Sequence, residues 1–124
     1  MKKLFPALFI LFLMFSCGQE QKSVQVGDPD NGGLTLPEGF SALVVADEIG
    51  RGRHITVNNN GDIYVSLAQH SENKGIVCLR DSSGDGKADI IQYTGQHTGT
   101  GIKLHKGYLY FGADTAVVRY PLTN

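Results

Sequence analysis

The chain has 124 residues, a formal net charge of −1 at neutral pH, 16 glycines and no tryptophan. This length allows one domain at most. Nucleic-acid-binding proteins usually have an excess of basic residues, and this chain has none, which argues against that class. The many glycines, with no long helical periodicity after residue 20, favour an all-β fold with many turns.

The N-terminus has the features of an export signal. Lys2 and Lys3 precede an apolar run over residues 4–15, which is too short to form a stable membrane-spanning helix. A small residue followed by Cys17 at the end of this run resembles a bacterial lipoprotein signal. The resemblance implies that residues 1–16 are removed and that lipid on the Cys17 sulfur anchors the protein in the cell envelope, periplasmic or at the outer membrane. The alternative is an ordinary secretory signal with an incidental cysteine.

The segment after the signal has the composition of a linker. Residues 17–33 are rich in Gln, Asp, Asn and Gly and contain few apolar side chains. Such a composition predicts a flexible polar tether between the anchor and a folded domain. The folded domain is expected over residues 34–124.

Short apolar runs alternate with turns throughout this domain, which is the pattern of antiparallel strands. Polar or glycine-rich loops are expected between the strands, including one over residues 68–74. Asn60-Gly61 tolerates the positive φ that a hairpin turn needs. The expected strands are residues 41–46, 54–58, 62–67, 75–80, 88–94, 102–105, 108–113 and 116–120.

Two of the hairpins form a near repeat. Residues 54–66 and 101–112 each contain a strand, a tight turn with glycine, and a second strand with an aromatic residue. Ile55 and Ile102 are 47 residues apart, close to the length of one β-propeller blade. The sequence therefore predicts one blade of four antiparallel strands and three strands of the next, about one and three-quarter blades of an incomplete propeller.

One blade pair leaves open sheet edges and an uncovered apolar face. We therefore expect one of three situations. The full protein continues beyond Asn124, the chain is a truncated product, or several copies assemble.

Five segments of the domain carry a further pattern, at residues 36–40, 51–55, 60–65, 81–89 and 107–110. Their order and spacing resemble the start of the quinoprotein sugar dehydrogenases, and more narrowly the sorbosone dehydrogenase-like proteins, over residues 34–122. The resemblance implies a six-bladed propeller that binds pyrroloquinoline quinone (PQQ) and oxidises a sugar or sugar aldehyde in the periplasm. The chain would be an N-terminal fragment of such a protein, and its electron acceptor is not identified.

Three residues could carry this chemistry. Sugar oxidation by a quinone needs a base for the hydroxyl proton, which suits histidine, and cations for the quinone carboxylates, which suit arginine. His97 lies just before an inner strand, and the resemblance implies that it is the catalytic histidine. Arg53 and His54, at the start of the first inner strand, are the expected cofactor-binding residues. The alternatives are a solvated loop histidine at position 97 and structural channel residues at positions 53 and 54.

The segment at residues 81–89 has the spacing of a calcium-binding loop. Such loops supply oxygen ligands at positions 1, 3, 5 and 9, a glycine at position 6 and a backbone carbonyl at position 7. The alternative is that Asp-Gly turns close a hairpin without a metal. The corresponding residues are Asp81, Ser83, Asp85, Lys87 and Asp89.

A second class of function fits the same sequence. A non-catalytic propeller could bind a protein or a carbohydrate partner, without PQQ. Cys78 lies in an apolar strand and is expected to be a small buried core residue in either case. Contact with a membrane is expected through the lipid anchor only.

Overall fold

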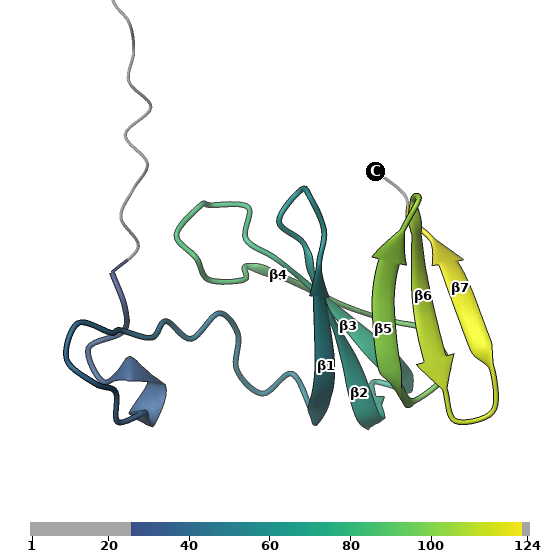
Figure 1. Ribbon diagram of the computed structural model, residues 1–124, viewed down its shortest axis with the longest axis horizontal. Helices are drawn as coiled ribbons and strands as arrows, with labels where there is room; N and C mark the ends of the chain where they lie inside the picture. Colours follow the sequence, from purple (N-terminus) through teal and green to yellow (C-terminus); the bar gives the residue numbers. More distant parts are fainter. Residues whose placement is uncertain (1–25, 123–124) are drawn as a thin grey trace, which may run out of the picture.

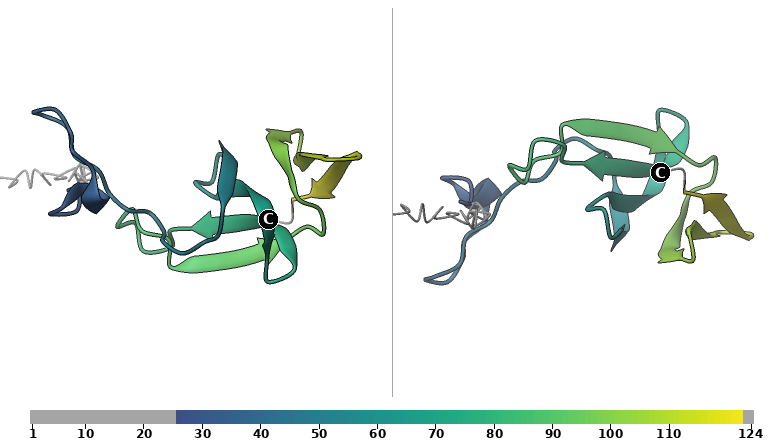
Figure 2. Two further views of the ribbon diagram at one scale, coloured as in Figure 1. Left: turned by 90° about the horizontal axis from the view of Figure 1, so that it is seen from below. Right: turned by 90° about the horizontal axis from the view of Figure 1, so that it is seen from above.

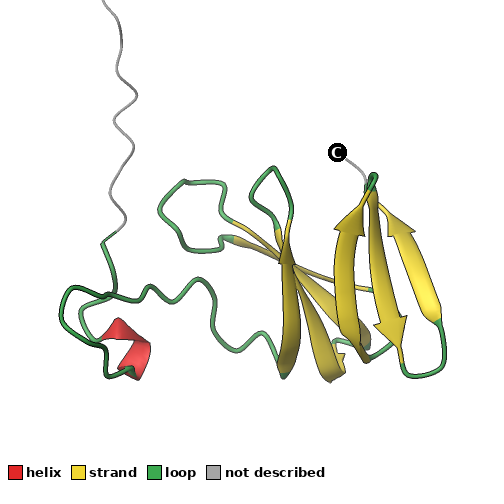
Figure 3. Cartoon of the chain, in the orientation of Figure 1, coloured by secondary structure: helices red, strands yellow, loops and turns green. Residues whose placement is uncertain are grey.

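The computed structural model describes residues 26–122, apart from the side chain of His70. The predicted signal peptide, Cys17 and the tether up to residue 25 lie outside the described residues. Two antiparallel sheets and one short 3-10 helix, η1 (Asn31–Gly33), make up the described part, which confirms the all-β prediction (Figures 1 and 3). The first sheet contains β1 (Gly52–Val57), β2 (Ile63–Ser71), β3 (Lys74–Arg80) and β4 (Ile90–Thr94), and the second contains β5 (Gly99–His105), β6 (Tyr108–Ala113) and β7 (Val117–Pro121).

Both sheets are meanders in which neighbouring strands follow one another along the chain. Ile55 lies opposite Val65 in the first sheet, and the equivalent Ile102 lies opposite Phe111 in the second. The register also shifts near the start of both first strands, between residues 52 and 54 and between residues 99 and 101. The near repeat of the sequence is therefore a repeat of structure, including the same irregularity at the same place.

The first sheet packs apolar side chains on both of its faces, because successive residues of a strand point to opposite sides. Val65 and Val77 belong to a cluster on the outer face, against which the half-buried Ala46 and Ile49 pack. Ile76 belongs to a second cluster between the two sheets, together with buried residues of β5 and β6: Ile102, Leu109 and Phe111. The inter-sheet cluster holds the two sheets together face to face (Figure 2).

The prediction of a strand at residues 41–46 is wrong, because this segment lies outside both sheets. Its backbone is bonded to loops instead. Ala42 N–H donates to Asn31 Oδ1 (3.0 Å), Ala42 C=O accepts from Asp28 N–H (2.8 Å), and Val45 C=O accepts from Ala88 N–H (2.7 Å). Of this run only Ala46 packs against the outer cluster, so the apolar composition does not reflect pairing with another strand.

The prediction of a long loop over residues 68–74 is also wrong. Strand β2 continues to Ser71 and β3 begins at Lys74, so that only two residues connect them. Glu72 and Asn73 both have positive φ, 52° and 59°, as a two-residue hairpin turn that follows the strand twist requires. The polar composition of this segment belongs to an exposed hairpin end.

Candidate functional site

The expected site residues come from one end of the two sheets. Arg53 and His54 lie at the start of β1, and His97 lies in the connection between β4 and β5. Strands β1 and β5 both begin at the lower end of the view in Figure 1. The meander brings the two candidate cofactor residues and the candidate histidine toward the same end of the fold.

The backbone of His97 is fixed by a close approach to β3. Gly75 N–H donates to the carbonyl of Gly95 (3.0 Å), which draws the β4–β5 connection onto the start of β3. A Cβ added at Gly75, which is buried, would overlap the His97 carbonyl. Only glycine fits at position 75, and its small size sets where His97 lies.

A buried serine joins the first strands of the two sheets. The Oγ of Ser66, which is fully buried, lies 3.3 Å from the carbonyl oxygen of His54 and 3.1 Å from that of Thr100. One hydroxyl proton can serve only one of these acceptors at a time. The side chain of Ser66 nevertheless contacts both the start of β1 and the start of β5.

The side chains of the three candidate residues are exposed. Within residues 26–122, no hydrogen bond or ring contact joins Arg53, His54 and His97 to one another. The ion pairs among the described side chains are those of Arg80 and Lys87, so the guanidinium of Arg53 is not committed to a carboxylate there. A cation and two imidazoles at one solvent-facing end can receive an anionic ligand and accept a proton.

The predicted calcium loop connects β3 to β4, and its first residue accepts hydrogen bonds from the loop backbone. Asp81 Oδ1 accepts from the N–H groups of Ser83 (3.1 Å) and Gly84 (2.6 Å), and Oδ2 accepts from that of Gly86 (2.7 Å). The N–H groups of Gly86 and Gly84 hold the pKa of Asp81 below its usual value. The loop is therefore closed around an ionised carboxylate.

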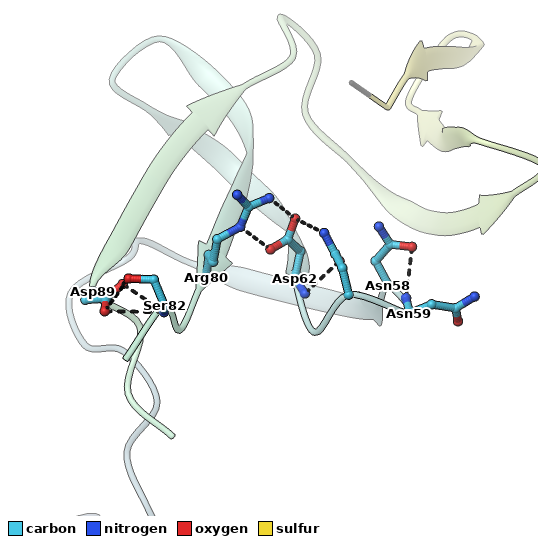
Figure 4. Close-up of polar contacts among 7 residues, drawn as sticks. Asn58, Asn59, Asp62, Arg80, Ser82 and Asp89 are labelled. Carbon is cyan, nitrogen blue, oxygen red and sulfur yellow. Dashed lines mark hydrogen bonds and ion pairs between the residues drawn. The ribbon is translucent and has the colours of Figure 1, made fainter. Parts of the chain in front are cut away.

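The other candidate ligands are also engaged within the protein. The hydroxyl of Ser82 lies 2.9 and 2.8 Å from the two carboxylate oxygens of Asp89 and can donate to either of them (Figure 4). Asp85 Oδ1 accepts from Lys87 N–H (2.9 Å), and Lys87 Nζ pairs with Asp28 Oδ1 (2.7 Å). In the part of the chain that the structure describes, no three acidic, histidine or cysteine side chains gather as a metal site. A metal here would use carboxylate lone pairs that these hydrogen bonds leave open.

A cavity of about 480 Å³ between the two sheets contains an ion pair that the sequence analysis missed. Asp62, only 2% exposed, lies at the end of the β1–β2 turn, opposite Arg80 of β3. Arg80 Nε and Nη2 each donate to one oxygen of this carboxylate at 2.6 Å, and Asn60 Nδ2 donates at 2.9 Å (Figure 4). The register of the β2–β3 hairpin could have predicted this ion pair. Pairing of Ile63 with Leu79 places residues 62 and 80 opposite each other.

Two further titratable groups line this cavity. Burial, with a smaller contribution from the neighbouring Cys78, raises the pKa of Tyr64 to about 12. Burial also raises the pKa of Cys78, so its thiol stays protonated at neutral pH and is not a reactive thiolate. Cys78 is half-buried at the cavity, not inside a core cluster as the sequence predicts.

The fold and these sites define an all-β protein of two packed antiparallel sheets, with four and three strands. Comparison of the chain with known protein families, curated proteins and solved structures finds no match. Over residues 26–122, no helix has the length and hydropathy needed to cross a membrane.

Proposed function

We propose that the two sheets are consecutive blades of a β-propeller and that the chain is the N-terminal part of a PQQ-dependent, sorbosone dehydrogenase-like oxidoreductase. The main support is the structural repeat, in which β1 and β5 share a register shift at positions 47 residues apart. Ser66 joins these two first strands, as is expected of inner strands around a common axis. The outer face of the first sheet also keeps exposed side chains, including Ile55 and Val57, which a further blade would cover.

The residues at the end of the fold where β1 and β5 begin suit the proposed chemistry. PQQ, when bound, supplies the acceptor for the two electrons of sugar oxidation. The Arg53 guanidinium would pair with a carboxylate of the cofactor, and His54 would line the site. His97, held at its backbone by Gly75, would accept the hydroxyl proton of a sugar or sugar aldehyde. A lipid on Cys17 would keep this reaction in the bacterial envelope.

Titration calorimetry of PQQ into the chain, with calcium present, tests this proposal. We expect saturable binding that Arg53→Ala weakens about tenfold or more, because a charge-assisted hydrogen bond is lost. Arg119→Ala, which removes an exposed arginine of β7, is the matched control and should leave the affinity unchanged. A folded chain that binds no PQQ would contradict the proposal.

A binding module without catalysis is the second proposal, and one observation favours it. The outer face of the second sheet presents Tyr108 and Tyr110 beside Arg119, a combination common where proteins bind proteins or sugars. This function predicts a folded chain that ignores PQQ and tolerates His97→Ala.

Calcium at the β3–β4 loop is a further proposal, with a structural role at the end of the fold away from Arg53 and His97. We expect added Ca²⁺ to raise the melting temperature, since a ligand that binds only the folded state at about 100 times its Kd adds about 2.7 kcal/mol. The Asp81→Asn variant should not show this Ca²⁺-dependent rise in melting temperature, because the substitution removes the charge that the loop encloses. Thermal unfolding with and without Ca²⁺ measures the increment. Asp47→Asn, an exposed aspartate outside the loop, should retain it, and an equal shift in both variants would exclude this site.

A further inference from the structure

The outer face of the second sheet is lined by aromatic and basic side chains. Residues of β5 and β6 alternate between the inter-sheet cluster, which takes Ile102 and Phe111, and the opposite side. We call that side the aromatic–basic face, and its members are Lys103, His105, Tyr108, Tyr110 and Arg119.

The aromatic–basic face is an ordered surface. The rings of Tyr108 and Tyr110 lie 6.4 Å apart between centroids, and Arg119 Cζ lies 4.7 Å above the Tyr108 ring. Lys103 and His105 line a hollow of about 330 Å³ beside Tyr110. Between residues 99 and 122, Asp114 in the β6–β7 turn is the one acidic residue. The face therefore suits a partner that is both acidic and apolar.

The N-terminal part of the described chain has the opposite character. Residues 26–50, here called the acidic segment, contain five acidic residues and no lysine or arginine. Phe40 is 71% exposed and Leu34 is 59% exposed, so this short stretch of sequence presents two large apolar side chains to solvent. Asp28 is paired with Lys87, and Glu38 lies between the two exposed apolar residues.

The two surfaces lie at opposite ends of the molecule. In Figures 1 and 2 the acidic segment projects on one side of the first sheet, and the second sheet lies on the other side. A contact between them within one chain would have to pass through the first sheet. A contact between two copies has no such obstacle.

We propose that the acidic segment of one copy docks on the aromatic–basic face of a second copy. Phe40 and Leu34 supply the apolar part of the contact, and the acidic side chains meet Lys103 and Arg119. The contact joins two different surfaces, so it is heterologous, and a pair of copies keeps one free acidic segment and one free aromatic–basic face for further copies. The inference rests on the fold and on charge, and is independent of PQQ.

Sedimentation velocity of the full 124-residue chain, in density-matched detergent because residues 4–15 are apolar, measures this association. We expect concentration-dependent dimers and larger species that weaken as salt is added. Phe40→Ser and Lys103→Glu should each weaken association about tenfold or more, since each removes a central contact. Glu72→Lys, a charge reversal in the exposed β2–β3 turn, should leave it unchanged.

Mixing the two variants separates this arrangement from a symmetric one. Phe40→Ser keeps an intact aromatic–basic face and Lys103→Glu keeps an intact acidic segment, so their mixture should form dimers that neither forms alone. The double variant should not associate with itself. If circular dichroism shows that Phe40→Ser is unfolded, Glu38→Lys replaces it. A chain that stays monomeric at its highest soluble concentration, or single variants that still associate, would overturn the proposal.

Discussion

Replacing Gly75 by alanine is expected to destabilise the protein by about 3 kcal/mol or more, or to prevent folding. The new Cβ would overlap the backbone carbonyl of His97, which cannot turn aside as a flexible side chain could. Relief requires the β4–β5 connection to move away from β3, and the hydrogen bond from Gly75 N–H to Gly95 C=O would be lost with it. Urea unfolding followed by circular dichroism measures the change.

Gly101→Ala is the matched control for this substitution. A Cβ at Gly101 would meet its nearest atom, Gly112 Cα, at 3.7 Å, which is an ordinary contact, so we expect a change within about 1 kcal/mol. Equal stability of the two variants would show that the β4–β5 connection does not rest on Gly75. If Gly75→Ala folds, the proposed function predicts a slower sugar oxidation, because the proposed base His97 would be displaced.

Local patterns were enough to predict most of the strands. In β2, Val65 and Leu67 alternate with Tyr64 and Ser66, and this alternation matches the two faces that the structure assigns. The failure at residues 41–46 has a different origin. A short apolar run has the same composition whether it pairs with a strand or bonds to loops, and Ala42 and Val45 find their backbone partners in loops distant in sequence.

The site was less predictable than the fold, since its determinants are contacts between distant residues. The position of His97 just before β5 follows from the sequence. Its support by Gly75, and the bridge from Ser66 to Thr100, depend on how the two sheets pack. The role of Gly75 could not be predicted from the sequence, because glycine is common at the ends of strands.

The substitution Asp62→Asn is expected to lower the free energy of unfolding by about 1–3 kcal/mol at neutral pH, the range for losing hydrogen bonds to a charged group. Asparagine keeps the shape of the side chain but loses the charge that Arg80 contacts through two bonds of 2.6 Å. Asp114→Asn, in the exposed β6–β7 turn, is the matched control and should change stability by less than about 0.5 kcal/mol. Urea unfolding at several pH values measures both variants.

The pH dependence distinguishes the lost charge from lost packing. The hydrogen bonds of Arg80 hold the pKa of Asp62 below its usual value. Protons therefore bind the unfolded chain more readily, and the stabilisation is complete above the unfolded pKa, near 4, and is lost as pH falls through the folded pKa. The stability difference between the wild type and Asp62→Asn should accordingly be full at pH 7 and shrink below about pH 4, because a protonated aspartate is as neutral as asparagine. A difference that stays constant down to acid pH would mean that shape, not the Arg80 ion pair, accounts for the cost.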